Sequence, residues 1–197
     1  MILFLLHIFA HHQAVFSQDQ KTFLWRVQSK TSTVYVLGSI HIFKKENYPL
    51  HPKIENAFGQ SDVLAVEANV GGAGNVDAQK LMEKALYPGD ETLEKHLSGE
   101  TYGFVKKELE GLGIPLQLVQ KQRPWFLALT LTSLGTLKLG YDPNSGIDMY
   151  FLSKAKGKKR ILELESFDYQ IRLLSEFSEN DQELFLLYTF ILVQDNF

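Results

Sequence analysis

The sequence predicts an α/β domain with a mixed, mostly parallel central sheet and helices on both faces, incomplete at its C-terminus. Short runs rich in apolar and β-branched residues occur at 33–37, 62–67 and 160–164. Segments with helical periodicity separate them, and the strand–helix–strand unit across 33–67 fits a right-handed parallel crossover. A chain of 197 residues, 45% of them hydrophobic, is long enough for one domain with a substantial core.

The remaining elements follow from local patterns. Strands at 22–27 and 33–37 are joined by a polar segment, which predicts a β-hairpin. Apolar spacing and stop signals predict helices, which we expect at 52–58, within 75–113, at 124–139 and at 147–155. Ser166 is expected to cap the helix after strand 160–164, and Asn180 or Asp181 the last helix.

The N-terminus has the features of an export signal. Residues 2–10 are apolar except for His7, and Val15-Phe16-Ser17 places compact residues before a cut at Gln18. This predicts a signal peptide over residues 1–17, a domain over 22–197, and a periplasmic or extracellular location. The segment lacks the Lys or Arg that usually precedes the apolar stretch.

Composition excludes several classes of protein. A formal net charge of −3 without a basic stripe gives no basis for nucleic acid binding, and Lys154 to Arg160 is interpreted as a solvated helix end. The absence of cysteine excludes disulfides and thiolate metal sites. Leu184 to Val193 is about half the length of a membrane span and is predicted to be a core helix.

The glycine-rich segment Gly71–Gly74 follows a predicted strand, as phosphate-binding loops do. It has neither the dinucleotide-binding fingerprint nor the Walker spacing. We therefore interpret it as a connecting loop.

Three predicted strands end on residues that can do chemistry: His41, Glu67 and Glu165. Ligands bind at the carboxyl ends of strands in open α/β sheets, so these side chains are expected near one rim. Imidazole and carboxylate together bind Zn²⁺, Mn²⁺, Co²⁺ or Fe²⁺, and a carboxylate beside such an ion can act as a general base. A glutamate in this position can instead cap a helix or pair with lysine.

An ordered set of short motifs resembles the TraB/GumN family. The motifs are Phe23–Val27, Val34–His41 with its Gly-Ser-Ile-His end, Tyr48–Leu50, Ser61–Glu67, Arg123-Pro124-Trp125, Gly146-Ile147-Asp148 and Leu162–Ser166 followed by Gln170. The resemblance covers about residues 22–177. A single Gly-x-x-His motif carries little information, whereas the ordered set is specific.

The resemblance implies a metal-dependent hydrolase of peptidase or esterase type, related to TraB-domain metalloproteases that cleave Wnt proteins. It implies that His41 and Glu67 bind a divalent ion (Mn, Co or Zn) and that Glu67 or Glu165 acts as the base. Arg123 would stabilise substrate or transition-state oxygen, unless it is a surface residue at a helix start. Asp148 matches another family position and is expected to contact substrate, either a peptide or a small molecule.

The chain departs from the family pattern in one respect. Full-length relatives carry a second Gly-x-x-His near their C-terminal end, and none follows position 41 here, since His51 and His96 lack the glycine. We therefore expect a fragment or truncated product with little activity alone. The alternatives are a peptide- or glycan-binding module of the cell envelope that does not turn over substrate, and a truncation without function.

Overall fold

The computed structural model describes residues 22–69 and 78–194. It divides into two compact units, residues 1–37 and residues 38–197. The predicted signal peptide, residues 1–17, and the loop Gly71–Gly74 both lie outside the described residues. In the part that the structure describes, no helix is long and apolar enough to cross a membrane.

The described part of the first unit is a β-hairpin, as predicted. Strands β1 (Leu24–Gln28) and β2 (Thr33–Leu37) pair in antiparallel register, with Trp25 opposite Val36 and Val27 opposite Val34. The turn is closed by the Ser29 N–H, which donates to the Ser32 carbonyl (2.8 Å). Because directly opposed residues share a face, these four apolar side chains form one exposed face of the hairpin.

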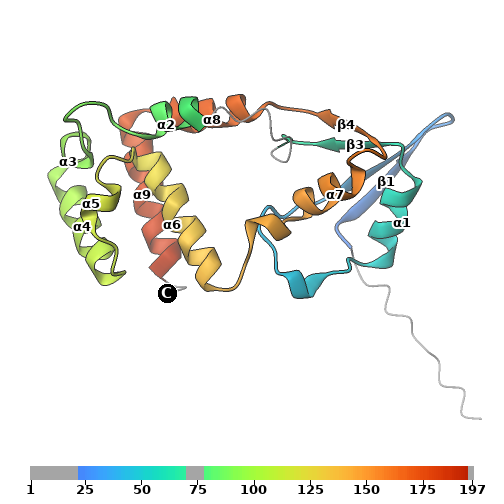
Figure 1. Ribbon diagram of the computed structural model, residues 1–197, viewed down its shortest axis with the longest axis horizontal. Coiled ribbons are helices and arrows are strands. Elements are labelled where there is room, and N and C mark those ends of the chain that lie inside the picture. Colours follow the sequence, from blue (N-terminus) through green and yellow to red (C-terminus); the bar gives the residue numbers. More distant parts are fainter. Residues whose placement is uncertain (1–21, 70–77, 195–197) are drawn as a thin grey trace, which may run out of the picture. The chain divides into compact units, whose positions relative to one another are not determined.

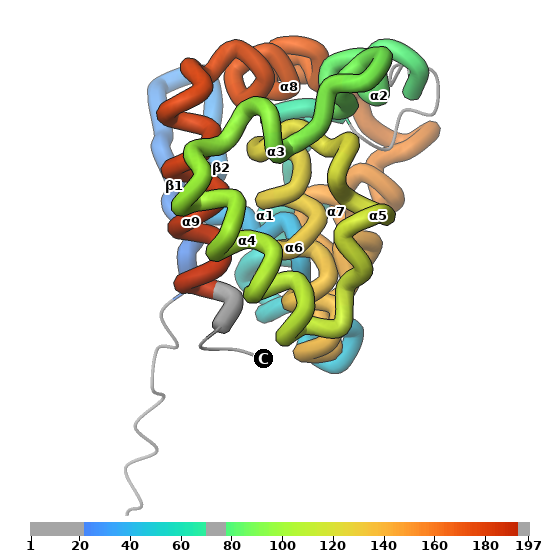
Figure 2. Tube along the Cα trace, turned by 90° about the vertical axis from the view of Figure 1, so that its left-hand side faces the viewer, coloured from blue at the N-terminus to red at the C-terminus, as the bar shows by residue number. Residues whose placement is uncertain are grey.

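The second unit contains a helical layer built around two long helices that pack side by side (Figure 1). Those helices are α6 (Pro124–Lys138) and α9 (Glu179–Gln194). Shorter helices cover one side of the pair (Figures 1 and 2): α3 (Leu93–His96), α4 (Gly99–Gly111) and α5 (Leu116–Val119). Leu127, Leu131, Leu186 and Phe190 are fully buried between these helices. One face of the apolar segment 184–193 is thus buried in the core, as predicted, whereas Leu184, Tyr188, Ile191 and Leu192 on the rest of the helix are exposed.

The same unit contains a parallel pair of strands, β3 (Val63–Val66) and β4 (Arg160–Glu163), in register from Val63 opposite Arg160. Helix α7 (Ile147–Ala155) packs on both strands. The other elements of this part are α1 (Pro52–Gln60) and the 3₁₀ turns η1 (Lys45–Asn47) and η2 (Pro143–Ser145). Helices α2 (Ala78–Ala85) and α8 (Phe167–Ser175) contact each other around buried Ala85, Trp125 and Ile171.

The α/β class is confirmed. The described strands pair as β1–β2, antiparallel, and as β3–β4, parallel. Strands β2 and β3 belong to different units, so the crossover between 33–37 and 62–67 stays a prediction. Strand β2 pairs with its immediate neighbour, because a four-residue turn closes with little loss of chain entropy.

Two predicted caps had different outcomes. The Ser166 side chain accepts the Tyr169 N–H (3.1 Å) at the start of α8, as predicted. The prediction for α9 was wrong, since Ser178 accepts the Asp181 N–H (3.1 Å) and its hydroxyl donates back to the Asp181 carboxylate (2.7 Å). The capping residue of α9 is therefore Ser178, and Asp181 lies in the first turn of the helix, where its carboxylate accepts the Ser178 hydroxyl.

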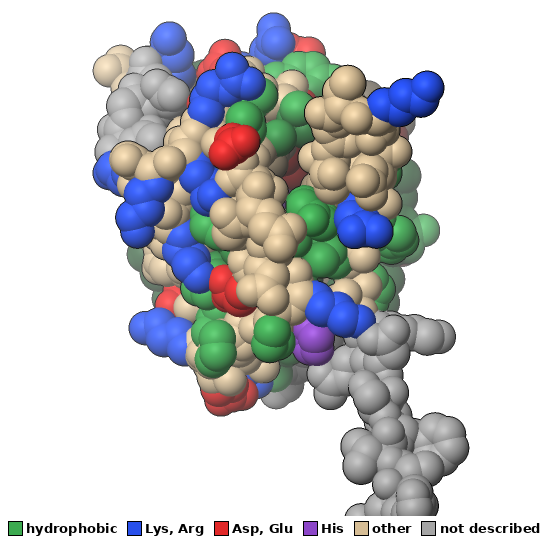
Figure 3. Space-filling model, turned by 90° about the vertical axis from the view of Figure 1, so that its right-hand side faces the viewer, with side chains coloured by type: hydrophobic (Ala, Val, Ile, Leu, Met, Phe, Trp, Pro, Cys, Tyr) green, Lys and Arg blue, Asp and Glu red, His purple; other side chains and the backbone are tan. Residues whose placement is uncertain are grey.

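The run from Lys154 to Arg160 is a helix end leading into β4, as predicted, and it is solvated only in part, since Ala155 is fully buried. Lys156, Lys158 and Arg160 are exposed, and Figure 3 shows Lys and Arg side chains projecting from the surface. Lys159 instead donates to the Ser61 carbonyl and lies 4.8 Å from the centre of the Phe58 ring.

Helix α7 begins against the backbone of His41. The Ile147 N–H donates to the Ile40 carbonyl (2.9 Å), and the Tyr48 hydroxyl donates to the Ser145 carbonyl (2.7 Å). A Cβ placed on Gly146 would collide with the His41 carbonyl oxygen and lie 2.7 Å from its carbonyl carbon. Only glycine allows this approach without displacing the backbone.

A polar cluster joins α1 to α7. Glu55 accepts hydrogen bonds from the Lys154 ammonium (2.6 Å) and the Tyr150 hydroxyl, and Lys154 also contacts that hydroxyl (2.9 Å). Burial acts to raise the pKa of Glu55, but these hydrogen bonds outweigh it and hold the pKa below the ordinary value of 4.5. The pKa of Lys154 is raised, first by its hydrogen bond to Glu55.

Replacing Glu55 tests this cluster. Because its folded-state pKa is lowered, the carboxylate stabilises the fold above the ordinary pKa and loses that effect as pH falls through the lowered value. Glu55→Gln should lower the free energy of unfolding by roughly 1 kcal/mol at about pH 7, with the difference shrinking as the pH falls below the ordinary pKa of 4.5. Urea unfolding at a series of pH values measures this, with exposed Glu46→Gln as the matched control. A difference that does not change with pH would contradict the assignment.

Replacing Gly146 tests the approach of α7 to His41. Gly146→Ala should destabilise the protein by about 1–3 kcal/mol, because the methyl group must displace the His41 backbone or the start of α7. Gly103→Ala is the matched control, since a Cβ there meets no atom within 4 Å and the residue lies on the exposed face of α4. That substitution should stabilise by about 0.5–1 kcal/mol. Equal melting temperatures for the two variants would show that α7 does not need glycine at 146.

Candidate functional site

A pocket of about 400 Å³ lies where the ends of several segments of the second unit meet. It is lined by His41, Glu67, Ala68, Pro143, Asn144, Asp148, Met149 and Gln170. Glu67 and Ala68 directly follow β3, Pro143 and Asn144 belong to η2, Asp148 and Met149 to α7, and Gln170 to α8. Three of the residues singled out from the sequence, His41, Glu67 and Asp148, therefore share one pocket.

The His41 ring lies between two carboxylates. Its Nδ1 is 3.0 Å from Asp148 Oδ2, and its Nε2 is 3.5 Å from Glu67 Oε2. The histidine side chain is 70% exposed and that of Glu67 51%, whereas that of Asp148 is only 17% exposed. Of the two solvent-facing groups of the site, the His41 ring is thus held by a more buried acid.

Asp148 determines which nitrogen of His41 carries a proton on the side away from Glu67. A carboxylate accepts hydrogen bonds, so the Nδ1 that faces it carries the proton and donates. Nε2 is then the ring nitrogen on the side of Glu67. The Ser39 hydroxyl donates to the same carboxylate oxygen of Asp148.

Ser39, His41 and Asp148 are not arranged as a serine nucleophile with its base. Such a site requires a hydrogen bond between the serine oxygen and the histidine nitrogen opposite the aspartate. Here the Ser39 hydroxyl and the His41 ring both donate to Asp148. Ser39 therefore helps to hold the carboxylate rather than being activated as a nucleophile.

The donor set of the pocket fits part of a divalent metal site. Nε2 of His41 and the Glu67 carboxylate face the same space, and a nitrogen and an oxygen ligand suit Zn²⁺, Mn²⁺ or Co²⁺. A carboxylate on the second nitrogen of a histidine ligand is also typical of metal sites. In residues 22–69 and 78–194, however, no group of three His, Cys, Asp or Glu side chains converges on one point. The two carboxylates lie at different nitrogens of the ring.

Glu165 is close to the pocket in the chain but does not line it. Its backbone N–H donates to the Glu67 carbonyl (2.8 Å), which extends the β3–β4 pairing by one step. The neighbouring Glu163 accepts the Asn69 N–H (3.3 Å) and so holds the segment after Glu67. The catalytic role of Glu165 remains a prediction, and its backbone has a clear structural role.

Arg123 lies in the helical layer and is not among the residues that line the pocket. Its N–H donates to the Ala85 carbonyl (2.8 Å), and its guanidinium lies 4.8 Å from the centre of the Tyr87 ring. Its role in substrate binding stays a prediction that no contact with the pocket supports.

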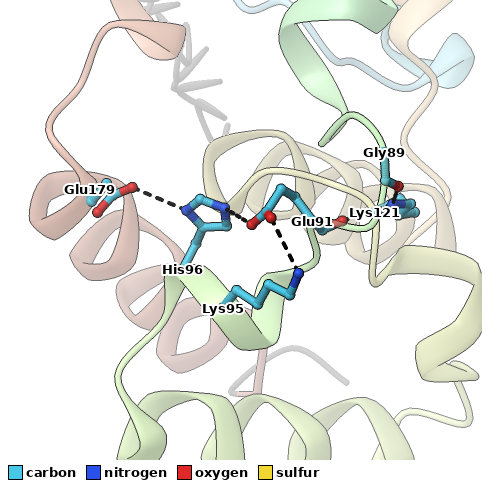
Figure 4. Close-up of polar contacts among 6 residues, drawn as sticks. All are labelled: Gly89, Glu91, Lys95, His96, Lys121 and Glu179. Carbon is cyan, nitrogen blue, oxygen red and sulfur yellow. Dashed lines mark hydrogen bonds and ion pairs between the residues drawn. The ribbon is translucent and has the colours of Figure 1, made fainter.

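His96, which lacks the glycine of the Gly-x-x-His motif, has a packing role. Its ring stacks on Tyr87 with centroids 4.2 Å apart, and its nitrogens face Glu91 (3.0 Å) and Glu179 (3.1 Å) (Figure 4). Burial raises the pKa of Tyr87 to about 12. Glu91 and Glu179 thus occupy both ring nitrogens, and the cluster joins α3 to the start of α9.

Several pocket residues were not recognised as functional candidates from the sequence. Gln170 was noted only as part of the family pattern, and Asn144 and Met149 were not singled out. A signal for Gln170 is present, because it lies one turn after the Ser166 cap that follows β4. The turn 141–146 and the first turn of α7 give no comparable signal for Asn144 and Met149.

Comparison with known proteins gives a consistent result. The model of the TraB/PrgY/gumN family matches residues 23–195. The uncharacterized protein YbaP of Escherichia coli K12 is 30% identical over 141 residues, which is 71% of this chain and 51% of YbaP, and the same values hold for YbaP of Shigella flexneri. An uncharacterized protein of Treponema pallidum is 22% identical over 183 residues, which is 90% of this chain and 53% of that protein.

The chain thus spans about half the length of these relatives. No solved structure matches it. The match of the family model over nearly all described residues shows that the chain belongs to the TraB/PrgY/gumN family.

Proposed function

We propose that this chain carries part of the active site of a divalent-metal-dependent hydrolase that cleaves a peptide or ester bond. The observation that carries the proposal is the geometry of His41, with Nδ1 bonded to Asp148 and Nε2 facing Glu67. Export to the periplasm or the extracellular space, predicted from residues 1–17, is part of the same proposal.

Each of the three residues has a separate task. Asp148 holds the His41 ring and keeps the proton on Nδ1, so that Nε2 and one Glu67 oxygen are the two ligands offered to the ion. A divalent cation bound there would supply Lewis-acid polarisation of a substrate carbonyl. The remaining Glu67 oxygen can accept a proton from the attacking water and return it to the leaving group as the C–N or C–O bond breaks.

Family membership supports this proposal without identifying the reaction. The similar proteins named above are themselves uncharacterized, and the chain covers about half of each. Since the described residues offer two ligands, an ion held by them alone would be bound weakly, and a complete site needs further donors.

The second candidate is a module that binds a peptide or glycan without turning it over. The number of ligands favours it, because catalytic zinc sites usually use three protein ligands, whereas only two potential ligands come together among the described residues. The two candidates make opposite predictions about metal binding.

A metal titration distinguishes them. If His41 and Glu67 bind Mn²⁺, Co²⁺ or Zn²⁺, the cation must stabilise the folded state, by about 2.7 kcal/mol at 100 times its Kd. The melting temperature should then rise by several degrees. Calorimetric titration should show the affinity reduced at least about 10-fold in His41→Ala and Glu67→Gln. His96→Gln is the control histidine and should bind as the parent does. Equal affinity in all four proteins would remove His41 and Glu67 from the metal site.

The role of Asp148 has its own test. Asp148→Asn should release the constraint on the His41 tautomer, because an amide can donate as well as accept at Nδ1. The ring ¹⁵N chemical shifts of His41 should then report a mixture of tautomers, whereas the parent should show one, with the proton on Nδ1. Metal affinity should fall about 10-fold or more with little change in stability. A parent spectrum with the proton on Nε2 would contradict the assignment.

A further inference from the structure

The part of the pocket lining that the structure describes offers a substrate no Lys or Arg side chain. None of the described residues that line it is Lys or Arg, while two of them, Glu67 and Asp148, are acidic. Lys45, in neighbouring η1, pairs with Asp142 at 3.9 Å. Residues 70–77, which follow β3 and Asn69 in the chain, contain no Lys or Arg in their sequence either. Recognition of phosphate or of a terminal carboxylate normally depends on Arg or Lys.

Apart from the acids and His41, the pocket lining is neutral. Ala68, Pro143 and Met149 give apolar contact, and Asn144 and Gln170 give side-chain amides. The Asn144 amide nitrogen already donates to Asp142 Oδ1 (3.1 Å). The Gln170 amide makes no hydrogen bond to any of the described residues, although it is only partly exposed.

Gln170 is held in place by backbone contacts. The β3–β4 pairing continues to the bond from Glu165 N–H to the Glu67 carbonyl, and Ser166 then caps α8. The Gln170 N–H donates to the Ser166 carbonyl (3.2 Å), which fixes its position in the first turn. Its side-chain amide therefore projects from a capped helix start at the wall of the pocket.

We propose that the pocket binds an uncharged secondary amide of the substrate and that Gln170 is the residue that hydrogen-bonds to it. A carboxamide has a donor and an acceptor side by side, and a secondary amide offers the matching acceptor and donor. Peptides and N-acetylated sugars both contain this group. This inference rests on the proposed function for the location of the reacting bond, but the binding itself requires neither metal nor turnover.

The test uses three small probes that differ in charge and origin. N-acetylglycinamide is a neutral peptide-type amide, N-acetylglycine is its anionic counterpart, and methyl N-acetylglucosaminide is a neutral sugar-type amide. Each is titrated into the intact ¹⁵N-labelled chain with EDTA present, and the Gln170 side-chain NH₂ signals and the His41 ring signals are followed. The two neutral probes test the shared chemistry, and the tighter of them identifies the source of the amide.

We expect a neutral amide to shift both sets of signals in a saturable way, with the anionic probe binding at least about 5-fold more weakly because Glu67 and Asp148 repel it. Gln170→Ala should weaken the neutral probe about 2- to 10-fold, as expected for one lost neutral hydrogen bond. Gln117→Ala, an exposed glutamine on α5, is the matched control and should have no effect.

Equal binding of the anionic and neutral probes, or unchanged affinity in folded Gln170→Ala, would overturn the inference. So would the absence of any shift at Gln170 with all three probes. These outcomes are separate from the metal titration. If the protein binds metal but the probes give one of these negative results, only the role of Gln170 is rejected. If the probes bind as expected but the protein has no affinity for metal, only the metal-dependent reaction is rejected.

Discussion

The close approach of Gly146 to the backbone of His41 is the contact on which the candidate site depends. Without a side chain at 146, the first turn of α7 can lie against residues 40 and 41, where the Ile147 N–H finds the Ile40 carbonyl. Asp148, in the first turn of α7, then lies close enough for its carboxylate to accept a hydrogen bond from Nδ1 of His41. A backbone contact between segments more than 100 residues apart thereby fixes both the ring and its protonated nitrogen.

A second long-range contact brings in the other wall of the pocket. Strands β3 and β4 pair in parallel, and the pairing continues past the strands to Glu67 and Glu165. The same strand pairing that places Glu67 beside His41 therefore also places the start of α8, and with it Gln170, at the pocket. The helical layer around α6 and α9 supplies a large part of the buried core of this unit but none of the described lining residues.

The two histidines that lie between carboxylates differ in the exposure of their side chains, and this difference decides whether the ring can reach a ligand. His41 and His96 each have an acidic oxygen near both ring nitrogens. The His96 side chain is 24% exposed and lies flat on Tyr87, so its nitrogens are occupied in joining α3 to α9. The His41 side chain is 70% exposed beside a cavity, so Nε2 and Glu67 remain accessible to a ligand. The same chemical groups thus stabilise the fold in one place and can bind in the other.

The sequence by itself determined what depends on near neighbours. The hairpin, the bounds of α7 at Ile147 and Ala155, and the Ser166 cap all follow from spacing, turn residues and side-chain chemistry within a few positions. The sequence also indicated His41, Glu67 and Asp148, because their motifs are local. Which strands pair, which side of the His41 ring each acid faces, and the separation of Arg123 from the pocket lining were decided only by the tertiary structure. Those features depend on the packing of distant segments, and a periodicity of a few residues carries no information about that packing.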